Sequence, residues 1–189
     1  MTNTTARRGG INWRLVGWGG AVALLMVPFI AMRVGGTGFD WTLGDFVVAG
    51  VLFAVVGLAI EFLARRSGLL SYRIAAAVGV FAGLFLIWVN LAVGIIGNEE
   101  HDANMLYALT IATAVGGSIV ARFRANGMAL AMLGAGGVTM AIALTAVAMG
   151  WGAETQNWPK DVLGASGIDT GIWLLSAALF RIAALSEAR

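Results

Sequence analysis

The sequence predicts an all-α, polytopic membrane protein with six transmembrane helices joined by short loops. Hydrophobic residues make up 59% of the 189 residues, and charged residues only 12%. The mean hydropathy of +0.86 is far above that of soluble domains, in which about a quarter of the residues are charged. Apolar runs recur along the chain at lengths near the roughly 20 residues that a helix needs to cross a bilayer core of about 30 Å. Basic and acidic loops alternate between these runs.

The first two predicted spans cover residues 13–32 and 41–64. The first begins after a short basic segment, but its length is that of a full span and no small-residue cleavage site follows. We therefore expect a membrane helix rather than a signal peptide. Pro28 lies one turn before its end, where the missing N–H can kink the helix. A glycine-rich turn at 35–38 separates the two spans.

The third predicted span, residues 73–97, runs uncharged from Arg73 to the acidic cluster that begins at Glu99. At 1.5 Å per residue it reaches about 36 Å as a helix. Small or polar residues share one stripe about 60° wide on this helix, namely Ala76, Gly79, Gly83, Asn90, Gly94 and Gly97. We expect this face to pack on protein, where the amide of Asn90 can find a partner.

The last three predicted spans cover residues 104–120, 128–151 and 171–185. Small residues line one face of the fifth and predict a tightly packed central helix or a subunit contact: Gly127, Ala131, Gly134, Val138, Ala141, Thr145, Ala148 and Gly152. The sixth run is short. Either its helix begins earlier and carries Asp169 into the interface, which we favour, or an amphipathic surface segment precedes it.

The charges predict the orientation of the chain. Ten of the twelve basic residues fall on one side of the six spans, and only Arg33 and Lys160 fall on the other. The far side collects the acids Asp40, Asp45, Glu99, Glu100, Asp102, Glu154, Asp161 and Asp169. Lys and Arg near span ends are retained in the cytoplasm. We therefore expect both the N- and the C-terminus to be cytoplasmic.

Polar residues predicted near the outer ends of the helices are candidates for a ligand or ion site. Asp45, Asn90, Glu99 and Arg33 can line an outward-facing polar pocket, with Asp45 roughly two turns inside the boundary. A set of interfacial hydrogen bonds explains the same residues without any ligand.

The acidic loop after the third span contains oxygen ligands that suit a hard divalent cation. Glu99, His101 and Asp102 are the metal candidates, although their spacing matches no EF-hand. A solvated loop in which Glu99 or Asp102 caps the next helix is the alternative.

Glu61 and Arg181 are candidates for a structural ion pair. Glu61 shares a small-residue face of the second span with Gly50, Ala54 and Gly57, so its carboxylate is expected to face protein. Its position near the cytoplasmic edge, one turn before Arg65, favours pairing with an arginine, and Arg181 is the expected partner. The alternative is a proton or cation site within the membrane.

Several function classes are excluded by composition. The chain has no cysteine, one histidine and one lysine, which removes thiolate chemistry, a membrane Schiff base and bis-histidine haem ligation. The hydrolase and phosphate-binding motifs are missing from the sequence. Basic residues flank apolar segments instead of forming a patch, so nucleic acid is not an expected partner. We expect no enzyme activity and no cofactor.

Three motifs carry a resemblance to a known family. WTLGDF at 41–46, WVNLAVGIIGNE at 88–99 and ARFRANGM at 121–128 resemble a family of small, uncharacterised bacterial integral membrane proteins. The resemblance covers about residues 41–130. It implies a bacterial inner (cytoplasmic) membrane as the location and implies no activity.

Two functional hypotheses follow from the sequence. The first is an accessory or scaffold protein that binds itself or a membrane partner through its Gly/Ala helix faces, with lipid around the rest. The alternative is a small transporter or channel for an ion or small solute. A metal- or quinone-dependent redox role is disfavoured because the ligands are missing.

Overall fold

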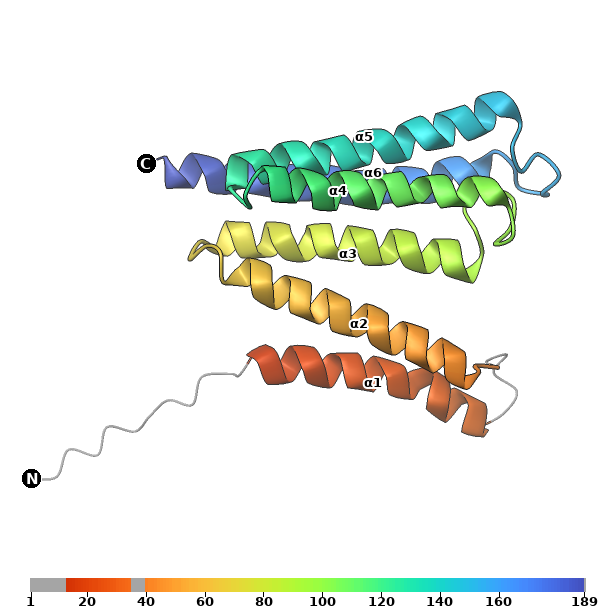
Figure 1. The fold of residues 1–189 in the computed structure, drawn as a ribbon. Helices are drawn as coiled ribbons and strands as arrows, with labels where there is room; N and C mark the ends of the chain where they lie inside the picture. Colours follow the sequence, from red (N-terminus) through yellow and green to blue (C-terminus); the bar gives the residue numbers. More distant parts are fainter. Residues whose placement is uncertain (1–12, 35–39, 189) are drawn as a thin grey trace, which may run out of the picture. The chain divides into compact units, whose positions relative to one another are not determined.

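A computed structural model describes residues 13–34 and 40–188 of the chain (Figure 1). The protein is 81% helical, and the described residues contain no β-strand. Six of the helices are long and apolar enough to cross a membrane. The predicted fold class is confirmed, and the chain is a multi-pass membrane protein.

The chain forms two compact units, Met1–Gly57 and Leu58–Arg189, and each is described by itself. The first contains α1 (Trp13–Val34) and most of α2 (Leu43–Ala64). α1 continues through Pro28 as one helix. The ring of Trp18 lies against Gly57, where a Cβ atom would be only 2.9 Å from the ring. Phe46 packs edge-on against Trp41 at 5.2 Å and against Phe29 at 6.4 Å between ring centres.

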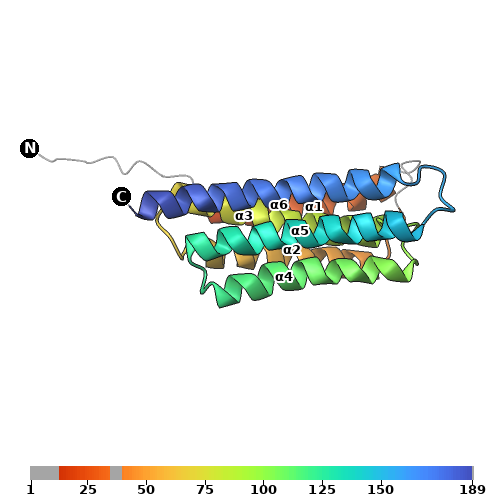
Figure 2. The ribbon, with the colours of Figure 1, turned by 90° about the horizontal axis from the view of Figure 1, so that it is seen from above.

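The second unit is a bundle that begins with the last turns of α2. Its elements are α3 (Leu70–Ala92), the 3₁₀ helix η1 (Asp102–Tyr107), α4 (Ala108–Val120), α5 (Ala125–Met149) and α6 (Lys160–Glu187). α6 packs against both α5 and α3, and α5 also packs against α4 (Figures 1 and 2). α5 and α6 are thus the central pair of the bundle.

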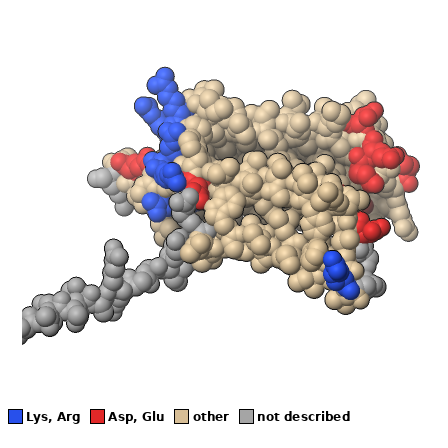
Figure 3. All heavy atoms as spheres, turned by 60° about the horizontal axis from the view of Figure 1, so that its bottom comes forward, with Lys and Arg blue, Asp and Glu red and all other residues tan. Residues whose placement is uncertain are grey.

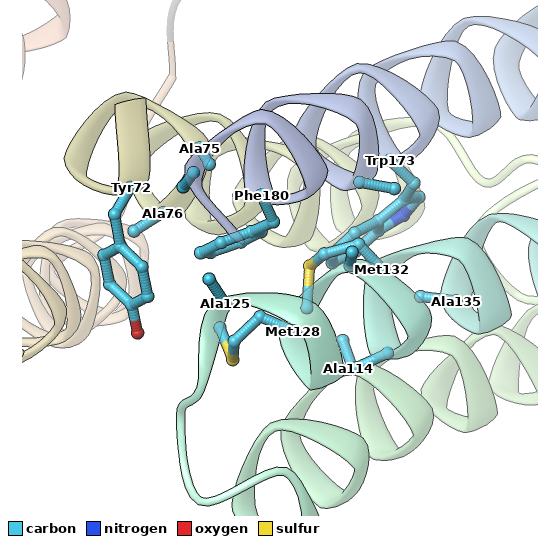
Figure 4. Close-up of a cluster of buried hydrophobic side chains, with 14 of the residues drawn as sticks. Tyr72, Ala75, Ala76, Ala114, Ala125, Met128, Met132, Ala135, Trp173 and Phe180 are labelled. Carbon is cyan, nitrogen blue, oxygen red and sulfur yellow. The ribbon is translucent and has the colours of Figure 1, made fainter. Parts of the chain in front are cut away.

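Large side chains of α6 fill space that small residues of its neighbours leave open (Figure 4). Phe180 meets Tyr72 edge-on at 5.1 Å between ring centres. A Cβ atom at Gly79 of α3 would lie 2.9 Å from Oγ of Ser176, and one at Gly136 of α5 would lie 3.2 Å from Cβ of Trp173. The small residues therefore permit the close approach of the helices.

Two predicted spans have different ends in the structure. α3 ends at Ala92 rather than near residue 97. Gly94 and Gly97 each have φ of +70°, a backbone conformation that glycine adopts most easily, so they belong to a turn rather than to the predicted helical stripe. α6 begins at Lys160, which confirms the favoured expectation that the last helix starts earlier than residue 171.

The small-residue face predicted for the fifth span divides into two halves. In the first half, Ala131 packs on Gly117 of α4, where a Cβ atom would lie 2.7 Å from that of Ala131. A Cβ atom at Gly127 would likewise lie 2.5 Å from that of Ala121. In the second half, Ala141 and Ala148 are exposed. The predicted small-residue face therefore packs on protein in the half nearer the start of α5 and is exposed in the other half.

The second unit carries opposite charges at its two ends (Figure 3). The α2–α3 and α4–α5 connections at one end bring together Arg65, Arg66, Arg73, Arg122 and Arg124. The α3–η1 and α5–α6 connections at the other end contribute Glu99, Glu100, Asp102, Glu154 and Asp161. The predicted separation of charge is present in the bundle, and the orientation of the termini stays a prediction.

The basic end contains a tight turn that neighbouring side chains hold in place. Arg122 and Phe123 have φ of 50° and 58°, which costs a non-glycine residue on the order of 1 kcal/mol or more. The hydroxyl of Tyr72 donates to the carbonyl of Phe123 at 2.7 Å. The guanidinium of Arg66 lies 4.4 Å from the ring centre of Phe62 and 5.0 Å from that of Phe123. These contacts offset the strain of the turn.

At the acidic end, the two connections touch through glycines. Gly152 has φ of +80°, and a Cβ atom there would lie 2.6 Å from the amide nitrogen of Gly97. The neighbouring Ile96 is completely buried. The acidic end is therefore packed protein rather than a pair of loose loops.

We expect Gly152→Ala to lower the free energy of unfolding by about 2 kcal/mol or more, because it adds a steric overlap to an unfavourable φ. Gly150→Ala is the matched control, since Gly150 has φ of +70° but has no atom within 4 Å of the added Cβ. Unfolding of both variants in lipid bicelles measures the difference. Equal losses would mean that the contact between the two loops contributes nothing.

Candidate functional site

A carboxylate is buried inside the bundle, at Asp169 of α6. It lies nine residues after Lys160, or about 13 Å along the helix axis. Its exposed fraction is 0%, and it is the one buried carboxylate of the described residues. An ionisable group within a membrane bundle is a candidate functional residue on physical grounds, because burying it is costly.

Side chains of α6 and α5 donate to one oxygen of this carboxylate, and α4 extends the network. The indole N–H of Trp173 donates to Oδ2 of Asp169 at 2.8 Å, and the hydroxyl of Thr139 on α5 lies 3.3 Å from the same atom. Thr110 of α4 extends the network, with its hydroxyl oxygen 3.2 Å from that of Thr139. Both threonines are completely buried.

The other oxygen of Asp169 has no partner. Oδ1 is completely buried and has no hydrogen-bond partner within the described part of the chain. The sequences of α4 and α5 contain no charged residue. On α6 itself, Arg181 follows twelve residues later, or about 18 Å along the axis, and donates to Asn126. The site is therefore a carboxylate with hydrogen-bond donors and no counter-ion among the described residues, an expensive arrangement in an apolar interior.

Hydroxyl groups continue along the same face of α6. One turn toward the acidic end, Ser166 and Tyr107 of η1 share a hydrogen bond of 2.7 Å. Two turns toward the basic end, Ser176 donates to the carbonyl of Ala75 on α3 at 2.8 Å. Residues 166, 169, 173 and 176 follow helical spacing, so they form one buried polar stripe.

The expectations drawn from the sequence do not include this site, because the expected helix start before residue 171 still leaves Asp169 at the interface. The spacing of Ser166, Asp169, Trp173 and Ser176 carried the signal. Polar residues recurring every three or four positions indicate one helix face. In a helix that extends back to Lys160, this face points into the bundle.

Asp45 and Arg33 belong to the first unit. Asp45 lies in the first turn of α2, not two turns inside it. Its Oδ2 accepts from the backbone N–H of Thr42 at 2.7 Å and from the Thr42 hydroxyl at 2.9 Å, and the Asp45 N–H donates to that hydroxyl at 3.3 Å. This reciprocal pattern is a capping box. Arg33 lies over the ring of Phe29, 5.1 Å from its centre. Both side chains thus have local structural roles.

Asn90 and Glu99 belong to the second unit. The side-chain N–H of Asn90 donates to the carbonyl of Leu86 on its own helix at 2.9 Å, and its Oδ1 is buried without a partner among the described residues. The partner expected from a neighbouring helix is therefore not observed. Glu99 is exposed in the loop that follows α3.

The acidic loop is organised by hydrogen bonds. Within the described ranges, no group of three His, Cys, Asp or Glu residues is placed to hold a metal ion. Nδ1 of His101 accepts from the backbone N–H of Ala103 at 3.2 Å and caps η1, while Glu99 and Asp102 are exposed. The structure therefore does not bring the three metal candidates together as a set of ligands, and the cap of η1 is His101 rather than an acid.

Asn104 holds this loop together, a role that the sequence analysis did not identify. Its Oδ1 accepts from the N–H groups of Ile95 and Ile96 at 3.0 and 2.9 Å. Its Nδ2 donates to the carbonyls of Ile96 and Asn98 at 3.1 and 2.6 Å. One side chain thus replaces the backbone partners that a helix would have supplied.

Glu61 forms its ion pair with Arg65, one turn later on the chain, at 3.3 Å. Arg181 instead donates to Asn126 of α5. The predicted pairing of Glu61 with Arg181 is therefore wrong, and Arg65 on the same helix pairs with Glu61 instead. Because the Arg65 side chain is 71% exposed, the pair contributes less than about 1 kcal/mol.

Comparison of the chain with protein-family models, with curated proteins and with solved structures finds no match. Its function is therefore inferred from the geometry of its own residues.

We expect Asn104→Ala to lower the free energy of unfolding by about 2 kcal/mol or more, because two buried N–H groups lose their acceptor at about 1–3 kcal/mol each. Hydrogen exchange of the Ile95 and Ile96 amides should also be faster in Asn104→Ala than in the wild type. Glu99→Gln, in the same loop but exposed, is the control and should change neither quantity. Unchanged exchange in Asn104→Ala would contradict the role given to Asn104.

Proposed function

We propose that this protein is a small transporter or channel of the bacterial inner membrane that moves a small cation, with the α3–α6 bundle as its body and Asp169 as the binding group. The observation that supports this most strongly is the completely buried carboxylate whose Oδ1 has no partner. An ionised carboxylate in that position has no positively charged side chain beside it among the described residues. A cation that binds at Asp169 supplies the missing counter-charge.

The surroundings of Asp169 favour this function over a purely structural role. A packing hydrogen bond is served equally well by a neutral Asn or Ser, without the cost of burying a charge. The polar stripe also extends from Asp169 toward the acidic end through the Tyr107–Ser166 hydrogen bond. Negative charges at that end attract cations.

The location and orientation are parts of the same proposal. The three motifs that resemble bacterial membrane proteins favour the inner membrane. The basic residues at the α2–α3 and α4–α5 connections favour a cytoplasmic position for that end of the bundle and for both termini. Tyr107 and Ser166 would then lie on the outer side of Asp169. The proposal needs no cofactor and no catalytic reaction.

We expect Asp169→Asn to reduce cation flux in proteoliposomes to the rate of empty vesicles, because it removes the titratable charge while keeping the size of the side chain. The flux of H⁺, Na⁺ and K⁺ is followed with ion-sensitive dyes under an imposed gradient. Glu187→Gln, exposed near the other end of the same helix and away from the acidic end, is the matched control and should retain the flux. Equal flux in wild type and Asp169→Asn would exclude Asp169 from transport.

The second candidate is an accessory or self-associating membrane protein, and a specific surface of α5 favours it. Ala141, Thr145 and Ala148 are exposed on one face of the second half of α5. Gly137 lies on the same face and has no atom within 4 Å of an added Cβ. Small residues at this spacing let membrane helices approach closely, so this face suits another helix, from a second copy or a partner protein.

If this face mediates association, Gly137→Leu should lower the yield of cross-linked dimers and the energy transfer between labelled copies in vesicles. Gly171→Leu is the control, because Gly171 is equally open but has the bulky Ile168 and Leu175 beside it on α6. Equal association of the two variants would remove the α5 face as a contact.

A further inference from the structure

The hydroxyl of Thr139 has more hydrogen-bond partners than it can serve at once. Its oxygen lies 3.2 Å from the carbonyl oxygen of Ala135, 3.3 Å from Oδ2 of Asp169 and 3.2 Å from the hydroxyl oxygen of Thr110. A hydroxyl carries one hydrogen and two acceptor lone pairs. Thr139 can therefore donate either to Ala135 or to Asp169, and not to both.

The protonation of Asp169 decides between these two arrangements. An ionised carboxylate only accepts hydrogen bonds, so Thr139 then donates to Oδ2 together with the indole of Trp173. When a proton adds to Oδ2, the resulting O–H donates to the oxygen of Thr139, and the hydrogen of Thr139 turns to the carbonyl of Ala135. Thr110 can donate to Thr139 in both states, so no hydroxyl loses its partner.

We propose that the cation bound at Asp169 is a proton, and that the Thr139 hydroxyl exchanges Asp169 for Ala135 as its acceptor when the proton binds. This inference rests on the proposed function, since it names the cation that the site accepts. The bound state is a neutral carboxylic acid, formed from a carboxylate and one proton, with no other bond made or broken.

The geometry favours a proton over a metal ion. A metal cation needs several oxygen ligands, and in membrane bundles these include carbonyls of unwound helix segments. Here Asp169, Thr139 and Thr110 lie inside the continuous helices α6, α5 and α4, whose carbonyls are used within the helices. The N–H of Trp173 also points at Oδ2 from 2.8 Å, where it would repel a metal ion. A proton needs only one oxygen.

Few other titratable groups face the site, so Asp169 is expected to titrate by itself. η1 brings Tyr107, which is engaged with Ser166. The sequences of α4 and α5 contain no titratable residue. The titratable residues of α3 are Tyr72 and Arg73, which lie in its first turn. On α6, Asp161 and Arg181 lie about 12 and 18 Å from Asp169 along the axis.

Infrared difference spectroscopy of the full chain in phosphatidylcholine vesicles tests this proposal. Stepping the pH should reveal a carboxylic acid C=O band that is lost on deprotonation, is absent from Asp169→Asn and is retained in Asp161→Asn. Replacing an organic cation by Na⁺ or K⁺ at constant pH should leave the band unchanged. Thr139→Val should shift the band, because the acid O–H loses its acceptor, whereas Thr139→Ser should keep the wild-type frequency. Circular dichroism and thermal unfolding check that each variant is folded.

Three results would overturn the proposal. A band that weakens when Na⁺ or K⁺ is added identifies a metal-cation site. An Asp169-dependent band that is missing at every pH where the protein is folded excludes proton binding. A band that is the same in folded Thr139→Val and in wild type excludes the hydroxyl exchange. The band reports proton binding and not flux. A band that titrates in a protein that moves no cation would therefore overturn the proposed transport function but not proton binding. A band that responds to Na⁺, in a protein that transports Na⁺, would overturn the proton as the bound cation but not the transport function.

Discussion

The bundle depends on how closely α6 can approach α3 and α5. Helices in a bilayer gain little from the hydrophobic effect, since lipid chains are as apolar as Leu, so close packing and buried hydrogen bonds must hold them together. Gly79 and Gly136 supply the close approach, because each leaves room for a side chain of α6, Ser176 and Trp173. The hydrogen bond from Ser176 to the carbonyl of Ala75 then joins α6 to α3. A methyl group at either glycine would push the helices apart and weaken both kinds of contact.

The two ends of the bundle are held by different means. At the basic end, aromatic rings and the hydroxyl of Tyr72 stabilise a turn whose Arg122 and Phe123 are in a conformation that glycine prefers. At the acidic end, glycines occupy the strained positions, and the amide of Asn104 satisfies the buried N–H groups of two isoleucines. Each end is therefore fixed by a few specific contacts, while the helices between the ends pack through small residues.

The sequence predicted the number of helices well because a hydrocarbon core requires about 20 apolar residues for each span, and this requirement is local. It located single polar residues less well. Asp45 and Glu61 are satisfied by Thr42 and Arg65, partners within four positions on the chain, whereas the sequence analysis looked for distant ones. Asp169 was misplaced for the opposite reason. Its partner Thr139 lies on another helix, and charge alone suggested an exposed position, although the polar stripe on α6 already indicated a buried face.

Packing and chemistry meet in one residue, Trp173. Its ring is buried and takes the space beside Gly136 and Gly83, so its position is set by the contact of α6 with α5 and α3. That same position directs its N–H to Oδ2 of Asp169. The carboxylate is thereby held with Oδ2 hydrogen-bonded and Oδ1 buried without a partner, and the described residues supply no counter-ion. A looser helix contact would let the side chain turn or admit water. The small residues of α3 and α5 are therefore as necessary to the site as the polar residues themselves, since they keep Asp169 buried and correctly oriented.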